Sequence, residues 1–223
     1  MPYKTTQREK IVECVSQMIK SLGVKSVRMD DVAANLGMSK RTLYEMFGDK
    51  EELLYESLVY MMIQRQQTLT EQVAKCDNML EVLLMSVRLL GHGSQSTDMD
   101  KRLATNLKKF YPNVYDRVKR MHAEQGMAGL QYALDKCREE GYLDPYVDVE
   151  LMVHLFFSTS GVLLTDDNIV IPEGVSREEA FGAMTVNFLR GLSTEKGLKV
   201  IDEILAREPR PKKLSERREI KNN

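Results

Sequence analysis

A short segment rich in basic and hydroxyl side chains is the part of this sequence best suited to polar recognition. Lys40, Arg41 and Thr42 are consecutive, and Tyr44 follows closely. Arginine forms paired hydrogen bonds with guanine, the threonine methyl group contacts thymine, and lysine and tyrosine bind phosphate oxygens. The segment therefore predicts contacts with nucleic acid, although short Lys-Arg-Thr runs are also common on solvated helix surfaces.

The apolar residues around this segment predict a helix-turn-helix. Leu43 and Phe47 lie one helical turn apart, so they share one face of a helix over residues 40–47 and leave the polar side chains on the opposite face. Ser39 is a favourable N-cap for this helix. A helix over residues 30–36 precedes it and ends at a glycine, as a tight reversal requires. The N-terminal residues of the second helix of such a motif enter the major groove of DNA.

Helical periodicity continues through most of the chain, so the sequence predicts an all-α fold. The first helix begins at a capping box formed by Thr6 and Glu9 and ends at Gly23. A second capping box, in which Glu52 follows Asp49, begins a helix that continues to about residue 74. The other expected helices cover residues 78–91, 99–110, 113–140, 148–165, 176–192 and 194–206. No stretch reads as a convincing strand.

Composition and charge favour a protein with a core of ordinary size and a basic N-terminal part. Hydrophobic residues make up 43% of the chain and charged residues 29%, which suits a soluble protein. The net charge of −1 is unevenly distributed: residues 1–50 carry +3, residues 51–206 carry −8 and residues 207–223 carry +4. A basic head joined to an acidic body fits a nucleic-acid module attached to another domain.

Two features indicate a cytoplasmic location. Charged residues interrupt the first apolar positions, so no signal peptide is expected. The most apolar stretch, residues 151–164, is too short to span a bilayer comfortably.

The remaining reactive side chains form no catalytic or metal-binding pattern. Cys14, Cys76 and Cys137 lack metal-type spacing and are too few for a disulfide framework, so reduced thiols are expected. The histidines are scattered, and no nucleophile–base spacing or glycine-rich phosphate loop is present. We therefore expect no enzyme activity, no metal site and no cofactor.

The segment VRMDDVAANLGMSKRTLYEMFGDKEELL, residues 27–54, resembles the DNA-binding signature of tetracycline-repressor-type (TetR family) transcription regulators. That signature joins a Thr-x-x-Asp-Ile-Ala helix start, a Gly-Val-Ser turn, a Thr-Leu-Tyr-x-x-Phe recognition helix and x-x-Lys-x-x-Leu. The matching residues are Asp31, Val32, Ala33, Gly37, Met38, Ser39, Thr42, Leu43, Tyr44, Phe47, Lys50 and Leu53. One departure is Arg28, which stands where the family usually has a capping threonine.

The resemblance implies a DNA-binding domain over residues 1–55, with the fourth helix continuing to about residue 75 as a connector. It also implies a helical ligand-binding and dimerisation domain over residues 78–206. Residues 207–223 are expected to form a disordered basic tail because few of them are apolar. The residues expected to bind DNA are Arg28, Ser39, Lys40, Arg41, Thr42, Tyr44 and Lys50.

Two apolar helices of the second domain are candidates for a dimer interface. The helix over residues 148–165 is apolar on nearly all sides, and the helix over residues 176–192 has two apolar rows. The alternative is that both are ordinary core helices. The interface candidates are Leu151, Leu155, Phe156, Met184 and Phe188.

A ligand pocket is the least defined expectation. Methionine suits an adaptable apolar site but also fills cores generally. The candidate lining residues are Met85, Phe110, Tyr111, Met121, Met127 and His154. The expected function is a homodimeric, ligand-responsive repressor that binds a palindromic operator in double-stranded DNA. The alternative is a helical small-molecule carrier or interaction protein that retains the fold without specific DNA binding.

Overall fold

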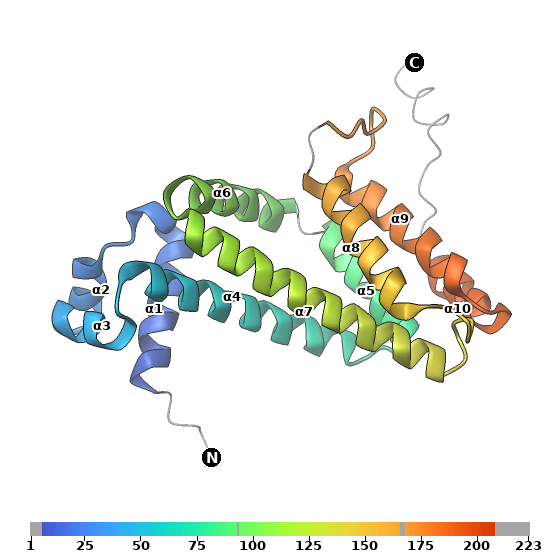
Figure 1. Ribbon diagram of the computed structural model, residues 1–223, viewed down its shortest axis with the longest axis horizontal. Coiled ribbons are helices and arrows are strands. Elements are labelled where there is room, and N and C mark those ends of the chain that lie inside the picture. The colour runs from blue at the N-terminus through green and yellow to red at the C-terminus, as the bar shows by residue number, and fades with distance from the viewer. Residues whose placement is uncertain (1–5, 93, 166–167, 208–223) are drawn as a thin grey trace. The chain divides into compact units, whose positions relative to one another are not determined.

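The computed structural model describes residues 6–92, 94–165 and 168–207, which form helices joined by short loops (Figure 1). The helices are α1 (Gln7–Leu22), the 3₁₀ helix η1 (Val24–Ser26), α2 (Met29–Leu36), α3 (Lys40–Phe47), α4 (Lys50–Val73), α5 (Met79–His92), α6 (Ser94–Phe110), α7 (Pro112–Glu139), α8 (Val149–Thr165), α9 (Arg177–Leu192) and α10 (Glu195–Ala206). Within the described ranges the only β-type pairing is an isolated bridge between Leu143 and Ser193. The predicted all-α class is confirmed. None of the described helices has the length and hydropathy needed to cross a membrane.

The chain packs into two compact units. Of the described residues, the head unit comprises those up to Gln72 together with Ser94–Ala123, and the body unit comprises those from Val73 to His92 together with those from Glu124 onward. The head unit therefore contains α6 and the first turns of α7 in addition to the N-terminal helices. The basic tail expected over residues 207–223 lies outside the described residues, apart from Arg207.

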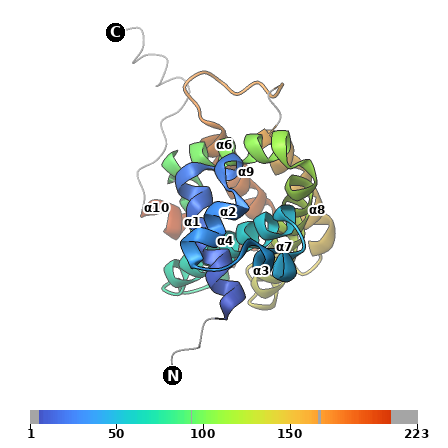
Figure 2. The same ribbon diagram turned by 90° about the vertical axis from the view of Figure 1, so that its left-hand side faces the viewer.

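One hydrophobic core joins the helices of the head unit. Leu107 of α6 and Val114 of α7 belong to the same buried cluster as the apolar faces of α1 to α4. Figure 2 views this unit from the side of α1, α2 and α3. The other buried members are Ile11, Val12, Val15, Met18, Ile19, Val24, Val27, Met29, Val32, Ala33, Leu43, Phe47, Leu53, Leu54 and Leu58. The helical periodicity seen in the sequence is thus the periodicity of this core.

Local sequence defines most helix ends, with one difference from expectation. The capping box at α1 is complete, because Thr6 Oγ1 accepts from the backbone nitrogen of Glu9 at 3.2 Å and the Glu9 carboxylate accepts from that of Thr6 at 2.7 Å. At α4 only half of the expected box forms. Asp49 accepts from the backbone nitrogen of Glu52 at 2.8 Å, but the Glu52 carboxylate pairs with Arg117 of α7. A long-range ion pair has replaced the local contact.

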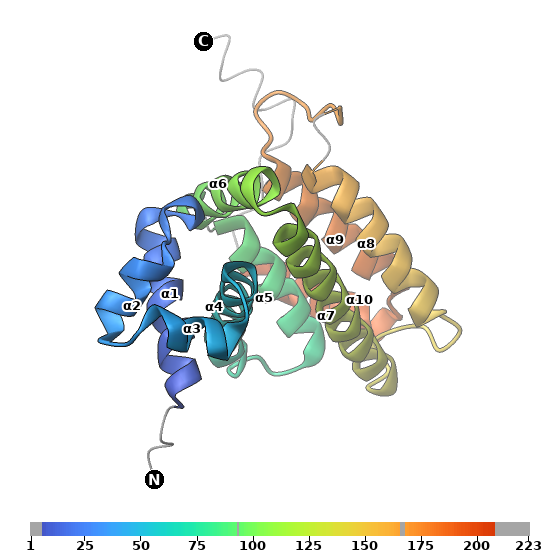
Figure 3. The ribbon, with the colours of Figure 1, turned by 60° about the vertical axis from the view of Figure 1, so that its left-hand side comes forward.

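The body unit is built on a second core, formed by α5, α8, α9, α10 and the second half of α7. Helices α8 and α9 run side by side (Figure 3). The fully buried side chains of this core include Leu80, Leu134, Leu143, Leu189 and Ile201.

The start of α10 is held against the loop after α7 by backbone contacts. Thr194 caps α10 by accepting from the nitrogen of Gly197 at 3.2 Å, and its own nitrogen donates to the carbonyl of Tyr142 at 2.9 Å. A Cβ atom on Gly197 would lie 2.2 Å from that Tyr142 oxygen. Only glycine therefore fits at this close approach.

Gly197→Ala tests this contact. Because the added methyl group meets a backbone oxygen, the loop or the helix must move, and we expect the free energy of unfolding to fall by about 1–3 kcal/mol in urea titrations. Gly191→Ala is the matched control, since a Cβ there meets no atom within 4 Å. Equal stability of Gly197→Ala and the wild type would contradict the packing described here.

Candidate nucleic-acid interface

Helix α3 is short, and its first turn is capped by its own hydroxyl groups. The Ser39 Oγ atom accepts from the backbone nitrogen of Thr42 at 3.1 Å and lies 2.8 Å from the Thr42 hydroxyl oxygen. An eight-residue helix is unstable alone in water. Leu43 is fully buried and Phe47 is 4% exposed, so tertiary packing stabilises the helix and fixes which side faces outward.

The side chains expected to reach DNA lie on the outward face. Arg41 is 86% exposed and Tyr44 is 42% exposed, while Lys40 and Ser39 are also exposed. The buried and exposed positions of α3 follow the pattern predicted from the sequence. That these side chains contact DNA remains a prediction.

Two basic side chains of α3 form ion pairs with carboxylates, and the sequence did not predict either pair. Asp30 of α2 accepts from the Lys40 ammonium at 2.9 Å, and Glu45 accepts from Nε of Arg41 at 2.8 Å. The hydrogen bond to Asp30, reinforced by its charge, raises the pKa of Lys40, so the ammonium stays protonated. Such exposed pairs are weak in water and exchange readily for a phosphate. The described residues offer no partner to the two terminal nitrogens of Arg41, which suits a bidentate contact.

The flanking candidates lie at the starts of α2 and α4. Arg28 is the exposed N-cap residue of α2 and makes no side-chain cap hydrogen bond, as expected from its replacement of threonine. Lys50 begins α4, where the helix dipole favours anions. Its side chain is half-buried, and its ammonium donates to the hydroxyl of Tyr111 at 2.7 Å.

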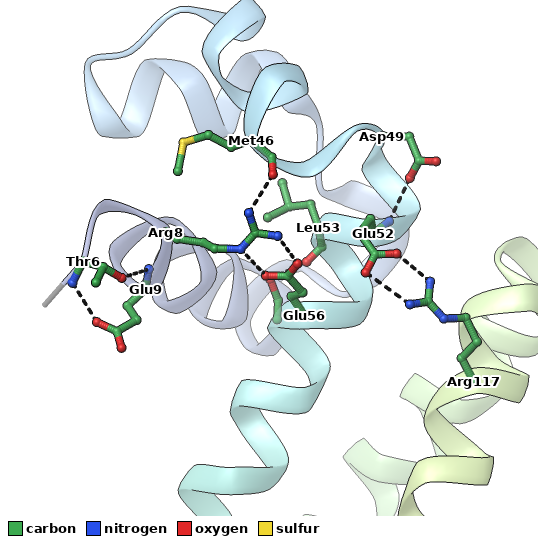
Figure 4. A network of polar contacts seen from close by, with 10 residues as sticks. Thr6, Arg8, Glu9, Met46, Asp49, Glu52, Leu53, Glu56 and Arg117 are labelled. Carbon is green, nitrogen blue, oxygen red and sulfur yellow. Dashed lines mark hydrogen bonds and ion pairs between the residues drawn. The ribbon is translucent and has the colours of Figure 1, made fainter.

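Two arginines tie neighbouring helices to α4 (Figure 4). Arg8 of α1 donates to the Glu56 carboxylate at 2.8 Å and to the carbonyl of Met46, near the end of α3, at 2.7 Å. Its guanidinium also lies 4.5 Å from the ring centroid of Phe47. The hydrogen bond with Glu56 raises the pKa of Arg8. This side chain therefore joins α1, α3 and α4.

Arg117 of α7 forms the second link. Its two terminal nitrogens lie 2.7 and 3.1 Å from the Glu52 carboxylate oxygens, and its guanidinium lies 3.8 Å from the ring centroid of Tyr55. The hydrogen bond to Glu52 raises the pKa of Arg117. The partners are far apart in sequence, so no local pattern signals either arginine link.

The six candidates for a ligand pocket fall in both units. Phe110, Tyr111 and Met121 belong to the head unit. Tyr111 binds Lys50, and Phe110 is 37% exposed. The body unit contains Met85, Met127 and His154. A pocket formed by these residues remains a prediction.

The dimer candidates occupy a partly exposed apolar face of the body unit. Leu151 and Leu155, one turn apart on α8, are 49% and 51% exposed, and Val162 further along α8 is 48% exposed. Phe156 packs its ring 4.9 Å from that of Phe188 of α9. The half-buried candidates are Phe156, Met184 and Phe188. Within the described residues, no three His, Cys, Asp or Glu side chains gather as a metal site.

Comparison with known proteins gives one family match and many similar folds. Residues 16–56 match the family model described as bacterial regulatory proteins, tetR family. The chain is 26% identical over 145 residues to YvaF of Bacillus subtilis, an uncharacterised HTH-type transcriptional regulator, covering 64% of this chain and 73% of YvaF.

Two solved structures illustrate the shared fold. A TetR-family transcriptional regulator from Cytophaga hutchinsonii has a TM-score of 0.59 at 12% identity, with 84% of this chain and 95% of the other covered. GusR of Salmonella enterica has a TM-score of 0.56 at 19% identity, with 84% and 99% covered. The family match lies on the helix-turn-helix, and the fold agrees over most of the chain. Residues 16–56 therefore carry the helix-turn-helix of the tetR family of bacterial regulatory proteins, and most of the chain shares the fold of a solved TetR-family regulator.

Proposed function

We propose that this protein is a homodimeric DNA-binding repressor whose α3 helix reads an operator. One observation carries the proposal: α3 buries Leu43 and Phe47 and exposes Lys40, Arg41 and Tyr44 on the opposite face. An eight-residue helix with one buried apolar face and one exposed polar face can insert its polar face into the major groove.

Each polar side chain of α3 has a distinct expected role. The terminal nitrogens of Arg41 match the N7 and O6 acceptors of a guanine, and the Thr42 methyl group suits a thymine. Lys40 and Tyr44 supply donors to phosphate oxygens, as do Arg28 and Lys50 at the adjacent helix starts. Two copies of α3 would then occupy successive major grooves of a palindromic operator.

The charge of the head unit supports this assignment. Over residues 1–72 and 94–123 the chain has 17 Lys and Arg against 13 Asp and Glu, so this unit is positive although the whole chain is not. A local excess of positive charge attracts DNA and makes binding dependent on salt concentration.

Arg41→Ala and Tyr44→Phe test the reading face. The operator would first be recovered by DNA selection with the purified protein, and affinities would then be measured by fluorescence anisotropy. Arg41→Ala is expected to weaken operator binding by about 5- to 150-fold, because it removes one bidentate hydrogen-bonded pair with a base. Tyr44→Phe is expected to weaken it less, because it removes one phosphate hydrogen bond. Both variants should keep the wild-type circular dichroism spectrum.

Lys199→Ala provides the matched charge control, because Lys199 is an exposed residue of α10 in the body unit. Its operator affinity should equal that of the wild type. Wild-type affinity in both α3 variants would refute the proposed face. A protein that bound selected and random DNA equally weakly would instead support the carrier or interaction alternative.

We also place the dimer contact on α8. Leu151, Leu155 and Val162 form an exposed apolar row, and large apolar side chains at such spacing are usually covered by a partner. The resemblance to TetR-family regulators, which typically dimerise, supports a second copy as that partner. Helix α9 would contribute Met184 and Phe188. A dimer would also set the distance between the two α3 helices.

Leu155→Glu tests this interface. A buried, unpaired carboxylate disfavours association, so the variant is expected to sediment as a monomer at concentrations where the wild type is a dimer. Operator affinity should fall with it, because one α3 helix then binds only a half-site. Val170→Glu is the control, since Val170 is 91% exposed and lies outside α8. If Leu155→Glu remained a dimer, the dimer contact would lie elsewhere. If the wild type were a monomer, there would be no dimer contact.

We further propose that a small molecule bound in the body unit weakens operator binding. The requirement is a higher affinity of the ligand for the dimer conformation in which the α3 helices are wrongly spaced. The resemblance to TetR-family regulators, in which ligand response is typical, supports this step. The residues expected to contribute are Met85, Met127 and His154.

A further inference from the structure

The turn between α6 and α7 presents two aromatic rings to lysines from three different elements. The ammonium of Lys50 lies 2.7 Å from the Tyr111 hydroxyl oxygen and 5.2 Å from the centroid of its ring. The ammonium groups of Lys25 and Lys109 lie 4.9 and 5.4 Å from the ring centroid of Phe110. This turn lies beside the first turn of α4 (Figure 1).

These three lysines differ in their partners from four other basic residues of the head unit. Among the described residues, none of the three forms an ion pair with a carboxylate. Lys40, Arg41, Arg8 and Arg117 all do so. Among the described residues no carboxylate pairs directly with these ammonium groups, so they are available to an external anion.

We propose that Tyr111 is a positioning residue that holds Lys50 for a DNA phosphate. The inference rests on the proposed DNA-binding function and adds to it a residue from outside the helix-turn-helix. The ammonium has three donors and Tyr111 accepts from one, so the others stay free for phosphate oxygens.

The environment of Tyr111 suits this role. Its ring is half-buried against the head core, and its backbone nitrogen donates to the carbonyl of Leu107 at 2.7 Å at the end of α6. Pro112 follows as the first residue of α7 and restricts the backbone there. A long, flexible lysine attached to so fixed an acceptor has lost rotamer freedom before DNA arrives, which strengthens binding.

A double-mutant cycle separates positioning of Lys50 from a general structural role. Tyr111→Phe, Lys50→Gln and the double variant would be titrated by anisotropy with a random-sequence duplex and with the selected operator. Tyr111→Phe alone is expected to weaken binding to both duplexes by the same factor, about three- to tenfold. In the Lys50→Gln background the same change should have less than about a twofold effect, because the residue acts through Lys50.

Salt dependence provides a second readout that a purely structural role would not produce. Lys50→Gln should reduce the slope of log affinity against log salt by about 0.9 for each phosphate that the variant no longer neutralises. Tyr111→Phe should leave the slope unchanged, since no cation is removed. Tyr115→Phe is the matched control. Tyr115 lies one turn further along α7, is also half-buried against the head core, and should bind DNA as the wild type does.

The contrary outcomes are distinct. Three results would overturn the positioning role and leave the DNA-binding function intact. In the first, Tyr111→Phe reduces affinity equally in both backgrounds, and in the second it leaves binding unchanged or makes it tighter. In the third result, a lowered melting temperature of Tyr111→Phe accounts for its weaker binding. Absence of salt-dependent DNA binding by the wild type would overturn both.

Discussion

Burial of Leu43 and Phe47 is the interaction on which the candidate interface depends. Helix α3 has only eight residues and could not persist on hydrogen bonds alone. Once these two side chains are inserted into the head core, the rotation of the helix about its axis is decided, and the polar side chains of its first turn must face outward. Arg8 of α1 lies outside this core, and its hydrogen bonds to the Met46 carbonyl and to Glu56 link the end of α3 to α1 and α4.

Two sets of basic residues in the head unit differ in their neighbours. Lys40 and Arg41 have carboxylate neighbours that a phosphate or a base must displace or share, which lowers the free-energy gain from nonspecific binding. Lys25, Lys50 and Lys109 have aromatic neighbours and, among the described residues, no carboxylate in an ion pair. In the proposed complex, Arg41 would supply selective contact with a base, and Lys50 would supply sequence-independent attraction to a phosphate.

Packing also makes the head unit larger than its helix-turn-helix. Leu107 of α6 and Val114 of α7 enter the same core as α1 to α4, and Arg117 of α7 binds Glu52 of α4. A three-helix module of about 55 residues buries a limited apolar area, so the added helices supply stability that the motif alone lacks. They also bring Tyr111 to Lys50, two residues that are distant in the sequence.

The sequence by itself determined the all-α class, the bounds of helix α3 at residues 40–47 and the outward face of that helix. These features follow from local rules, namely apolar periodicity, the Ser39 cap and the glycines at helix ends. It did not indicate Arg8 with Glu56, Arg117 with Glu52, or Tyr111 with Lys50. The sequence also predicted the wrong partner for Glu52, because its carboxylate binds Arg117 and does not complete the expected capping box. Such pairs depend on which helices pack together. The paired residues are 48 to 65 positions apart, so no local sequence pattern predicts their contact. Only the tertiary structure decided these contacts, because helix packing brings the side chains together.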